Sequence, residues 1–256
     1  MKVVITGAAG RLGASVRAEL ANRHQIRAFD LLPCPTEESI VGDLLDADTR
    51  HRALEGADAV VHLACFPQTW NSPRSYAVNA QGTYMLLETA QSLGLKRFIY
   101  ASTFSVFSSR QWAFYGSRGA LSEAVLPEPQ DVYGLTKYLG EEACRLFARR
   151  GMHCTILRLT VVTMPENWED ARRKGWGGVT HAADAAQAFR LALETEHQEG
   201  TARLCHICGD HANKPTPIDQ ARAMLGFSPR YNMPEPVSSG SAALPSGTRR
   251  CRKQPR

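Results

Sequence analysis

The amino-acid sequence predicts an α/β protein in which a doubly wound, mostly parallel sheet carries helices on both faces. Strand-like runs of β-branched residues alternate with helix-like segments along most of the chain, the order expected of parallel strands joined by crossover helices. The first strand runs into a turn that contains Gly7, Gly10 and Gly13, and then into a helix. The second strand ends in an acid, Asp30. These observations predict one sheet with a ligand-binding cleft at the carboxyl ends of its strands.

In the first part of the chain, short runs rich in Val and Ile predict strands, and apolar residues spaced three or four apart predict helices. Leu12, Val16 and Leu20, for example, share one face of the first helix. The expected order is strand 3–5, helix 11–22, strand 25–29, strand 40–41, helix 47–54, strand 57–64, helix 76–93 and strand 97–101.

After residue 101, glycines and prolines between residues 116 and 129 interrupt the regular pattern and predict a longer loop. The order then continues with helix 131–150, strand 154–159, helix 182–193, strand 202–207 and helix 218–225. Residues 1–232 are predicted to form one domain, in which about residues 160–232 supply a small substrate-binding portion. From residue 233 onward Pro, Ser, Gly and Arg dominate without apolar periodicity, so residues 233–256 are predicted to be a disordered basic tail.

The totals exclude several classes of protein. With 256 residues, 43% of them hydrophobic and 21% charged, the chain has the composition of a globular domain. No apolar run approaches the roughly 20 residues that span a bilayer, so no membrane segment is expected. The net charge of +5 is matched by five cations within residues 249–256, so the body is near neutral and no nucleic-acid partner is expected.

The cysteines point to a reduced setting. Seven of them are scattered without paired spacing, so we expect free thiols and a cytoplasmic location. Cys205 and Cys208 have the gap of a metal knuckle, but no second Cys or His pair accompanies them. No metal site is therefore predicted.

The turn from Gly7 to Gly13 is the strongest local signal of a binding site. A strand that turns tightly into a helix leaves the first N–H groups of the helix unpaired, and the helix dipole adds positive potential there. Such a turn can hold a phosphate group: Gly7 permits the turn, Gly10 lets a ligand approach and Gly13 lets the helix pack closely. Ordinary strand-to-helix turns can show the same spacing. Asp30 lies at the interval expected of an acid that binds the ribose of a dinucleotide, which favours NAD as the cofactor.

Tyr133 and Lys137 lie four residues apart in the predicted helix 131–150, so their side chains share one face. A phenol has a pKa near ~10 and is a poor base at neutral pH, but a nearby ammonium favours the phenolate and lowers that pKa. Lys137 can also hydrogen-bond the ribose of a dinucleotide. Ser102 and Thr103 follow strand 97–101, where a hydroxyl would position the reacting oxygen. A Tyr and a Lys at this spacing also occur by chance on many helices, but beside the glycine turn we expect them to be catalytic.

Over roughly residues 2–230 the chain resembles the extended short-chain dehydrogenases/reductases, the NAD-dependent epimerase/dehydratase family. The shared motifs are the turn Thr6-Gly7-Ala8-Ala9-Gly10-Arg11-Leu12-Gly13 and the segments Gly42-Asp43-Leu44, Val61-His62-Leu63-Ala64, Asn79-Ala80-Gln81-Gly82-Thr83, Tyr100-Ala101-Ser102-Thr103 and Tyr133-Gly134-Leu135-Thr136-Lys137. The resemblance implies a Rossmann-type fold and an NAD site made by Gly7, Gly10, Arg11, Leu12, Gly13, Asp30, Asp43, Leu44, Leu63, Ala64, Asn79 and Lys137. It also implies that Tyr133, Lys137 and Thr103, rather than Ser102, are the catalytic residues.

Within this family the chain most resembles uronate dehydrogenases, through residues 133–145, 164–167 and 225–229 and through its short C-terminal portion. This resemblance implies oxidation of a free hexuronate to an aldarolactone, and an Arg in the region of Arg172 and Arg173 that binds the substrate carboxylate. We expect Arg173 to contact the substrate together with Ser102 and Thr103. The cations of residues 172–174 also fit a solvated basic loop. Thr103-Phe104-Ser105 departs from the Ser-Asn-His of those enzymes, and the family's dimers imply a homo-oligomer.

The sequence therefore predicts an NAD-dependent oxidoreductase that removes hydride from a hydroxyl-bearing carbon of a small sugar or sugar acid. Two alternatives remain. A nucleotide-sugar epimerase or dehydratase would need a larger C-terminal part than this chain offers. A non-catalytic, dinucleotide-sensing regulator has no need of Tyr133 and Lys137. His62, at the end of a predicted strand, is expected to pack rather than to act as a base.

Overall fold

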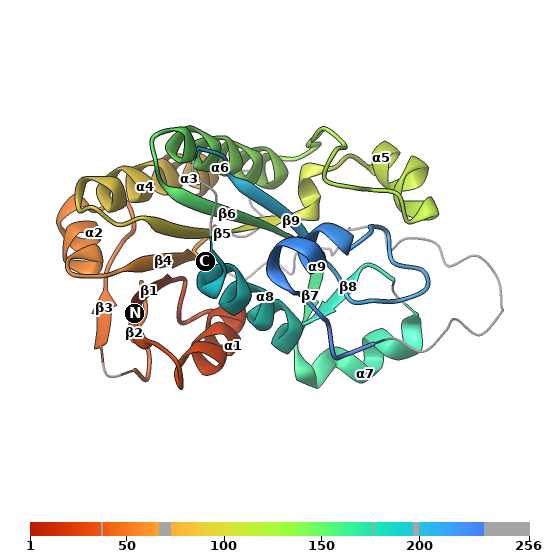
Figure 1. Cartoon of the computed structure of the whole chain (residues 1–256), viewed down its shortest axis with the longest axis horizontal. Coiled ribbons are helices and arrows are strands. Elements are labelled where there is room, and N and C mark those ends of the chain that lie inside the picture. Colours follow the sequence, from red (N-terminus) through yellow and green to blue (C-terminus); the bar gives the residue numbers. More distant parts are fainter. Residues whose placement is uncertain (37, 67–72, 176, 197–199, 233–256) are drawn as a thin grey trace, which may run out of the picture.

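The structure, a computed structural model, describes residues 1–36, 38–66, 73–175, 177–196 and 200–232. Its centre is a parallel sheet of seven strands in the order β3-β2-β1-β4-β5-β6-β9 (Figure 1). The strands are β1 (Lys2–Thr6), β2 (Gln25–Asp30), β3 (Glu38–Val41), β4 (Ala59–His62), β5 (Arg97–Thr103), β6 (His153–Leu159) and β9 (Arg203–Ile207). The strand order reverses direction between β1 and β4, which is where open α/β sheets of this kind bind ligands.

Helices cover both faces of the sheet (Figure 1). One face packs against α1 (Arg11–Leu20), α8 (Ala182–Glu194) and α9 (Asp219–Leu225). The other face packs against α2 (Ala47–Leu54), α4 (Thr83–Ser92) and α6 (Val132–Arg149). Val3 and Ile5 of β1 point into the first core and Val4 into the second, because successive side chains of a strand face opposite sides. The predicted fold class, a doubly wound parallel sheet with helices on both faces, is confirmed.

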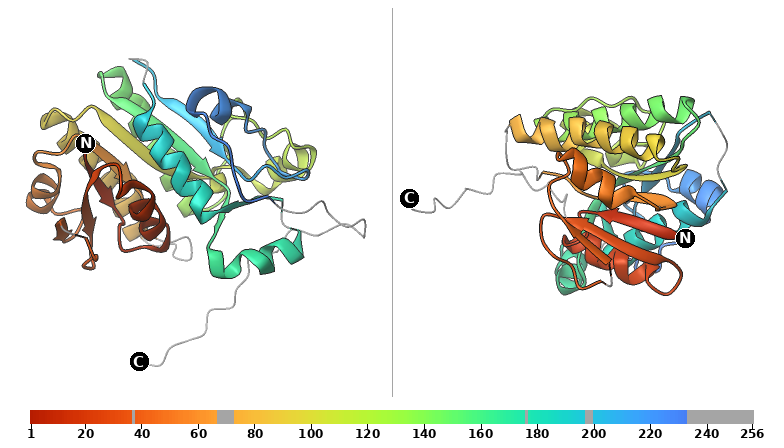
Figure 2. Two further views of the ribbon diagram at one scale, coloured as in Figure 1. Left: turned by 60° about the horizontal axis from the view of Figure 1, so that its bottom comes forward. Right: turned by 90° about the vertical axis from the view of Figure 1, so that its left-hand side faces the viewer.

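Two groups of short elements follow β5 and β6 beyond the carboxyl edge of the sheet (Figure 2). Strands β7 (Val161–Thr163) and β8 (Val179–His181) form a small parallel pair, joined by α7 (Pro165–Lys174). Between β5 and α6 lie two short 3₁₀ turns, η2 (Phe104–Val106) and η3 (Gly116–Arg118), and helix α5 (Ser109–Phe114).

The structure differs from the expected elements in three places. The loop expected after residue 101 contains α5, which a capping box of Ser108 and Gln111 begins. Helix α7 was not expected, although Pro165 in its first turn and Gly175 after its end are ordinary helix boundary signals. The single helix expected over residues 76–93 is a short α3 (Pro73–Ser75), a π-helical turn (Tyr76–Gly82) and then α4.

No described helix is long and apolar enough to cross a membrane. The predicted disordered tail, residues 233–256, lies outside the described residues. The division into a domain of residues 1–232 with a small substrate-binding portion stays a prediction.

Candidate functional site

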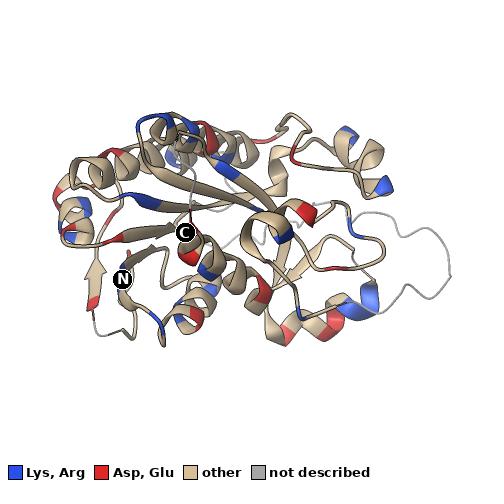
Figure 3. Ribbon diagram, viewed as in Figure 1, with Lys and Arg blue, Asp and Glu red and all other residues tan. Residues whose placement is uncertain are grey.

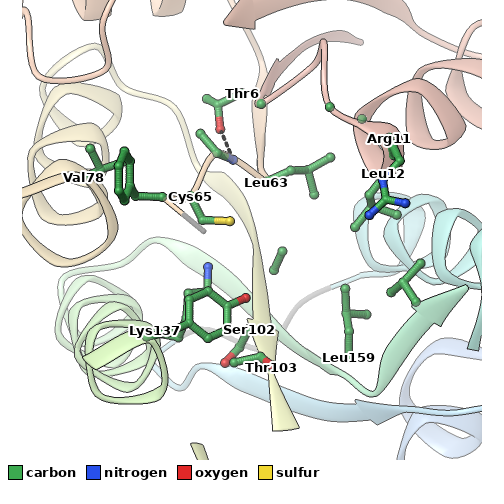
Figure 4. Close-up of a pocket in the computed structure, with 18 of the residues that line it drawn as sticks. Thr6, Arg11, Leu12, Leu63, Cys65, Val78, Ser102, Thr103, Lys137 and Leu159 are labelled. Atoms are coloured by element: carbon green, nitrogen blue, oxygen red, sulfur yellow. Dashed lines mark hydrogen bonds between the residues drawn. The ribbon is translucent and has the colours of Figure 1, made fainter. Parts of the chain in front are cut away.

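A cavity of about 850 Å³ opens at the carboxyl ends of the central strands, between the glycine turn and helix α6 (Figure 4). The register of the sheet places Thr6, His62 and Tyr100 in adjacent positions on β1, β4 and β5, so the segments that follow these strands meet at one edge. Most of the residues predicted for the site line this cavity: Gly7, Gly10, Arg11, Leu12, Gly13, Asp30, Asp43, Leu44, Leu63, Ala64, Ser102, Thr103, Tyr133 and Lys137.

The glycine turn has the close approaches that its sequence predicts. Gly7 has a φ of 68°, and a Cβ there would lie 2.6 Å from the Ala64 nitrogen. A Cβ at Gly13 would lie 2.3 Å from the Gly7 oxygen. Helix α1 begins after Gly10, and no side chain of the described residues caps its first turn. The open N–H groups and the helix dipole therefore face the cavity and fit the diphosphate of a dinucleotide.

Asp30 is fixed at the end of β2 beside this turn. Its carboxylate accepts hydrogen bonds from the backbone N–H groups of Ala9, at 2.9 Å, and Leu32, at 3.2 Å. The side chain thus lies at the rim of the cavity, where a ribose bound beyond the diphosphate would meet it.

The part of the cavity that fits the cofactor also contains an ion pair, which the sequence analysis did not predict. The guanidinium of Arg74 donates to Asp43 at 3.0 Å, and the other carboxylate oxygen of Asp43 accepts from the Leu45 N–H at 2.9 Å. Both Arg74 and Asp43 line the cavity. No local motif marks Arg74, because the contact joins segments 31 residues apart.

Tyr133 and Lys137 project from the first turns of α6 into the cavity (Figure 4 labels Lys137). Asp131 caps this helix by accepting from the Gly134 N–H at 2.6 Å. A Cβ at Gly134 would lie 2.1 Å from the Ser105 oxygen, so glycine here lets α6 approach the segment after β5. The Lys137 ammonium lies 4.2 Å from the centre of the Tyr100 ring.

Burial governs the protonation of this pair. Desolvation raises the pKa of Tyr133. The Coulomb interaction with Cys65 raises this pKa further, and the interaction with the Thr103 side chain lowers it. Desolvation lowers the pKa of Lys137, which Glu141 and the nearby thiols oppose. The net pKa of Tyr133 is therefore raised by its burial, and the expectation that the Lys137 ammonium lowers it stays a prediction.

Ser102 and Thr103 end β5 at the cavity but point to different partners. The Thr103 hydroxyl donates to the Ser105 oxygen at 3.2 Å and accepts from the Ser105 N–H at 3.1 Å. The Ser102 hydroxyl donates to the buried carboxylate of Glu141 at 2.6 Å. Ser102 and Thr103 thus both line the cavity, and the expected contact of Ser102 with a substrate stays a prediction.

Glu141 belongs to a buried polar network under the site. Arg158 on β6 donates to both of its carboxylate oxygens, at 2.8 and 2.7 Å, and is 1% exposed. Arg158 also lies 3.4 Å from His206 on β9, whose ring packs against Phe104 at 4.7 Å. Sequence analysis missed this network, although Glu141 follows Lys137 by one helical turn and so shares its face.

Asn79 and Arg173 are not among the described residues that line the cavity. Asn79 is fully buried, accepts from the Phe66 N–H at 2.6 Å and donates to Thr136 at 3.1 Å. It therefore ties the segment after β4 to α6, and its expected contact with NAD stays a prediction.

Arg173 lies on the solvent face of α7, where Figure 3 shows charges of both signs. Its side chain is 77% exposed and pairs with Asp170 at 3.5 Å, while Arg172 pairs with Glu169 at 2.9 Å. Trp168 and Ala171 occupy the buried face of the same helix. The structure therefore does not bring Arg173 to the cavity, because the helical period turns it away from the core, and its contact with a substrate stays a prediction.

His62 packs as expected. It is fully buried, its Nδ1 lies 2.6 Å from the Thr6 hydroxyl and its Nε2 lies 2.9 Å from that of Thr83. Desolvation lowers the pKa of His62 well below 6.5, so the ring is neutral. It connects the glycine turn to α4 and is not exposed to a substrate.

Comparison with known proteins agrees with this geometry. The model of the NAD dependent epimerase/dehydratase family matches residues 3–176. An L-arabinose 1-dehydrogenase (NAD(P)(+)) of Haloferax volcanii is 26% identical over 90% of this chain and 97% of its own length. A uronate dehydrogenase of Pseudomonas putida is 30% identical over 62% of this chain and 60% of its own. The crystal structure of uronate dehydrogenase from Agrobacterium tumefaciens superposes with a TM-score of 0.76 at 24% identity, over 91% of this chain and 85% of that one, and so shares the fold.

Proposed function

Since the chain belongs to the NAD-dependent epimerase/dehydratase family, we propose that it is an NAD-dependent oxidoreductase that removes hydride from a hydroxyl-bearing carbon of a small sugar. The observation that carries the proposal is the meeting of Thr103, Tyr133 and Lys137 in the cavity that also contains the glycine turn. The relatives named above are sugar and sugar-acid dehydrogenases, which supports the same substrate class.

The residues of the cavity fit the cofactor. The Gly7–Gly13 turn offers N–H groups to a diphosphate, Asp30 offers acceptors to the adenosine ribose, and Asp43 lies at the adenine end. Lys137, buried at the other end, is placed to hydrogen-bond the second ribose. When bound, NAD supplies the hydride acceptor, so the oxidised carbon of the substrate becomes a carbonyl.

The chain's own residues handle the proton. Thr103 orients the substrate hydroxyl, and Tyr133 as phenolate takes its proton while the C–H electron pair leaves the carbon. Lys137 favours the phenolate over the phenol when substrate and cofactor fill the site. The Ser102–Glu141–Arg158 network holds the end of β5 against α6 and thereby fixes the distance between Thr103 and Tyr133.

The hexuronate is the finer form of this proposal, and Arg173 does not support it, because that side chain pairs with Asp170 in solvent. We therefore propose the broader class, a small sugar. The alternatives of a nucleotide-sugar epimerase and a dinucleotide sensor differ in outcome: the first returns NAD unchanged, and the second turns over no substrate. Association into a homo-oligomer stays a prediction.

The test is a screen of the purified protein with NAD against arabinose, galactose, glucose and the corresponding uronates, followed by the absorbance of NADH. Tyr133→Phe should lose on the order of 10²–10⁴ in rate, because only the proton acceptor is removed. Its NAD affinity, measured by titration calorimetry, should stay near that of the unmodified protein. Lys137→Ala should lower both turnover and NAD affinity. Turnover by Tyr133→Phe at the unmodified rate would refute the assignment of the base.

A further inference from the structure

A second cavity, of about 620 Å³, adjoins the first, and one side chain lines both. That side chain is Trp112 of α5, which is half-buried between the two spaces. Building on the proposed function, we propose that Trp112 is the specificity-determining residue of the site. It closes off the second cavity and so restricts the substrate to a free monosaccharide, excluding a sugar that carries a phosphate or a nucleoside diphosphate.

The indole is held in a slot that glycines leave open. Its ring centre lies 5.7 Å from that of Phe104, the residue after Thr103. On the other side, a Cβ at Gly116 would lie 3.1 Å from the indole Cε3, and a Cβ at Gly178 would lie 3.5 Å from Cη2. The ring therefore lies between the segment after β5 and the segment before β8, and it fills the space that two missing side chains provide.

The chemistry of the second cavity differs from that of the first. Arg118 and Lys214 both line it, together with Ser117 and Asn213. The Lys214 ammonium pairs with Asp210 at 3.0 Å, and the Arg118 guanidinium lies 4.6 Å from the Phe114 ring centre. Two cations and two neutral polar side chains suit an anionic group such as a phosphate. Such a group, linked to a sugar at Tyr133, would have to pass through the position of the Trp112 ring.

The sugar end of the first cavity is closed by apolar surface. Beside Trp112, its lining includes Phe104, Val161, Val162 and Met164. Apart from Tyr133 and Lys137, the polar side chains at that end, Thr103, Ser105 and Thr160, are uncharged. A single neutral sugar, with hydroxyls for the polar groups and one apolar face for the indole, matches this lining.

The experiment compares the unmodified protein with Trp112→Ala and with a matched control, Leu126→Ala. Leu126 lies on the same connection between β5 and α6 but lines neither cavity and is 80% exposed. The measured quantity is the ratio of kcat/KM for glucose 6-phosphate, which keeps the anomeric hydroxyl, to kcat/KM for glucose with NAD. We expect Trp112→Ala to raise this ratio by at least about tenfold, the range that a change in pocket size produces. The control should leave it within about twofold.

Two further measurements keep this proposal separate from the proposed function. Calorimetric titration of the NAD-saturated protein with UDP-glucose should detect tighter binding to Trp112→Ala than to the unmodified protein, whether or not glucose is a substrate. If no sugar is oxidised at all, the proposed function fails while the UDP-glucose titration still decides the role of Trp112. Should Trp112→Ala fail to fold by circular dichroism, Trp112→Leu, which keeps an apolar contact with Phe104, is judged by the same ratio and titration. An unmodified protein that prefers glucose 6-phosphate to glucose, or variants that leave both the kcat/KM ratio and the affinity for UDP-glucose unchanged, would overturn the proposal.

Discussion

Replacing Arg158 by Met should destabilise the protein by about 3–5 kcal/mol, the cost of leaving one member of a buried ion pair without its partner. Arg158 is 1% and Glu141 0% exposed, and the guanidinium donates to both carboxylate oxygens. After the substitution Glu141 keeps the Ser102 hydroxyl at 2.6 Å and Arg145 at 3.3 Å. These two contacts cannot compensate the charge, because Arg145 is partly solvated and its bond is longer.

The assay is equilibrium unfolding in urea, followed by tryptophan fluorescence, on a double-mutant cycle of Arg158→Met and Glu141→Leu. The double variant removes both charges and should be at least about 2 kcal/mol more stable than Arg158→Met, since a buried pair replaced by apolar residues is often nearly neutral. Arg145→Met is the matched control, because it removes a cation from the same carboxylate at a site that is 28% exposed. It should cost less than about 1 kcal/mol.

Two results would refute this reasoning. A cost below about 1 kcal/mol for Arg158→Met would mean that other groups or solvent compensate the charge of Glu141 in the variant. Costs of the two single variants that add in the double variant would mean that the pair is not coupled.

Four further predictions concern charge and protonation. Asp30→Ala should narrow the preference for NAD over NADP in titrations of both oxidised cofactors, since the carboxylate repels a 2′-phosphate; tighter NADP binding by the unmodified protein would contradict this. The kcat/KM for oxidation should rise between pH 7 and 9.5, because desolvation raises the pKa of Tyr133 and only the phenolate accepts a proton; a flat profile would exclude Tyr133 as the base. Arg173→Lys should leave the ratio of galacturonate to galactose oxidation within about twofold of that of the unmodified protein, because Arg173 pairs with Asp170 in solvent. If the variant lost a preference for the acid, that result would support a contact between Arg173 and the substrate carboxylate. Stability in urea should fall as pH drops below 6.5, since burial holds the pKa of His206 well below that value and the unfolded chain alone takes up the proton. The slope should approach about 1.4 kcal/mol per pH unit for this histidine, and His206→Gln should reduce it by that amount.

The cofactor half of the site could be predicted from the sequence because its constraints are local. Gly7 and Gly13 are required by backbone atoms only a few residues away or on the adjacent strand, and a Cβ at either would meet backbone at less than 3 Å. Tyr133 and Lys137 share one face of a single helix, so their spacing alone determines that they point together. Asp30 follows from the end of the second strand in the same way.

The substrate half could not be predicted to the same depth because its contacts join distant segments. Ser102 and Thr103 are neighbours in the sequence. The Ser102 hydroxyl donates to the carboxylate of Glu141, which lies 39 residues further along the chain, and no local pattern marks that contact. Arg173 was placed by resemblance of a short segment, and the helical phase of α7, set by Trp168 and Ala171 against the core, turns it outward. Pro165 and Gly175 were visible boundary signals of that helix, so its existence was predictable and the pairing with Asp170 was not.

These two halves differ in what a substitution must displace, and this determines where substrate preference can change. At the cofactor end a new side chain meets backbone: a Cβ at Gly13 would lie 2.3 Å from the Gly7 oxygen, so the turn itself would have to move. At the substrate end the nearest obstacle to a larger ligand is a side chain, since the Trp112 indole occupies the space beside Gly116 and Gly178. Shortening one side chain there opens room without moving the strands that carry Thr103 or the helix that carries Tyr133. Substitutions in α5 and in the segment before β8 can therefore change the size of the accepted substrate while the Tyr133–Lys137 geometry stays fixed. For this reason, substitution of Trp112 can measure the selection between free and phosphate-linked sugars separately from hydride transfer.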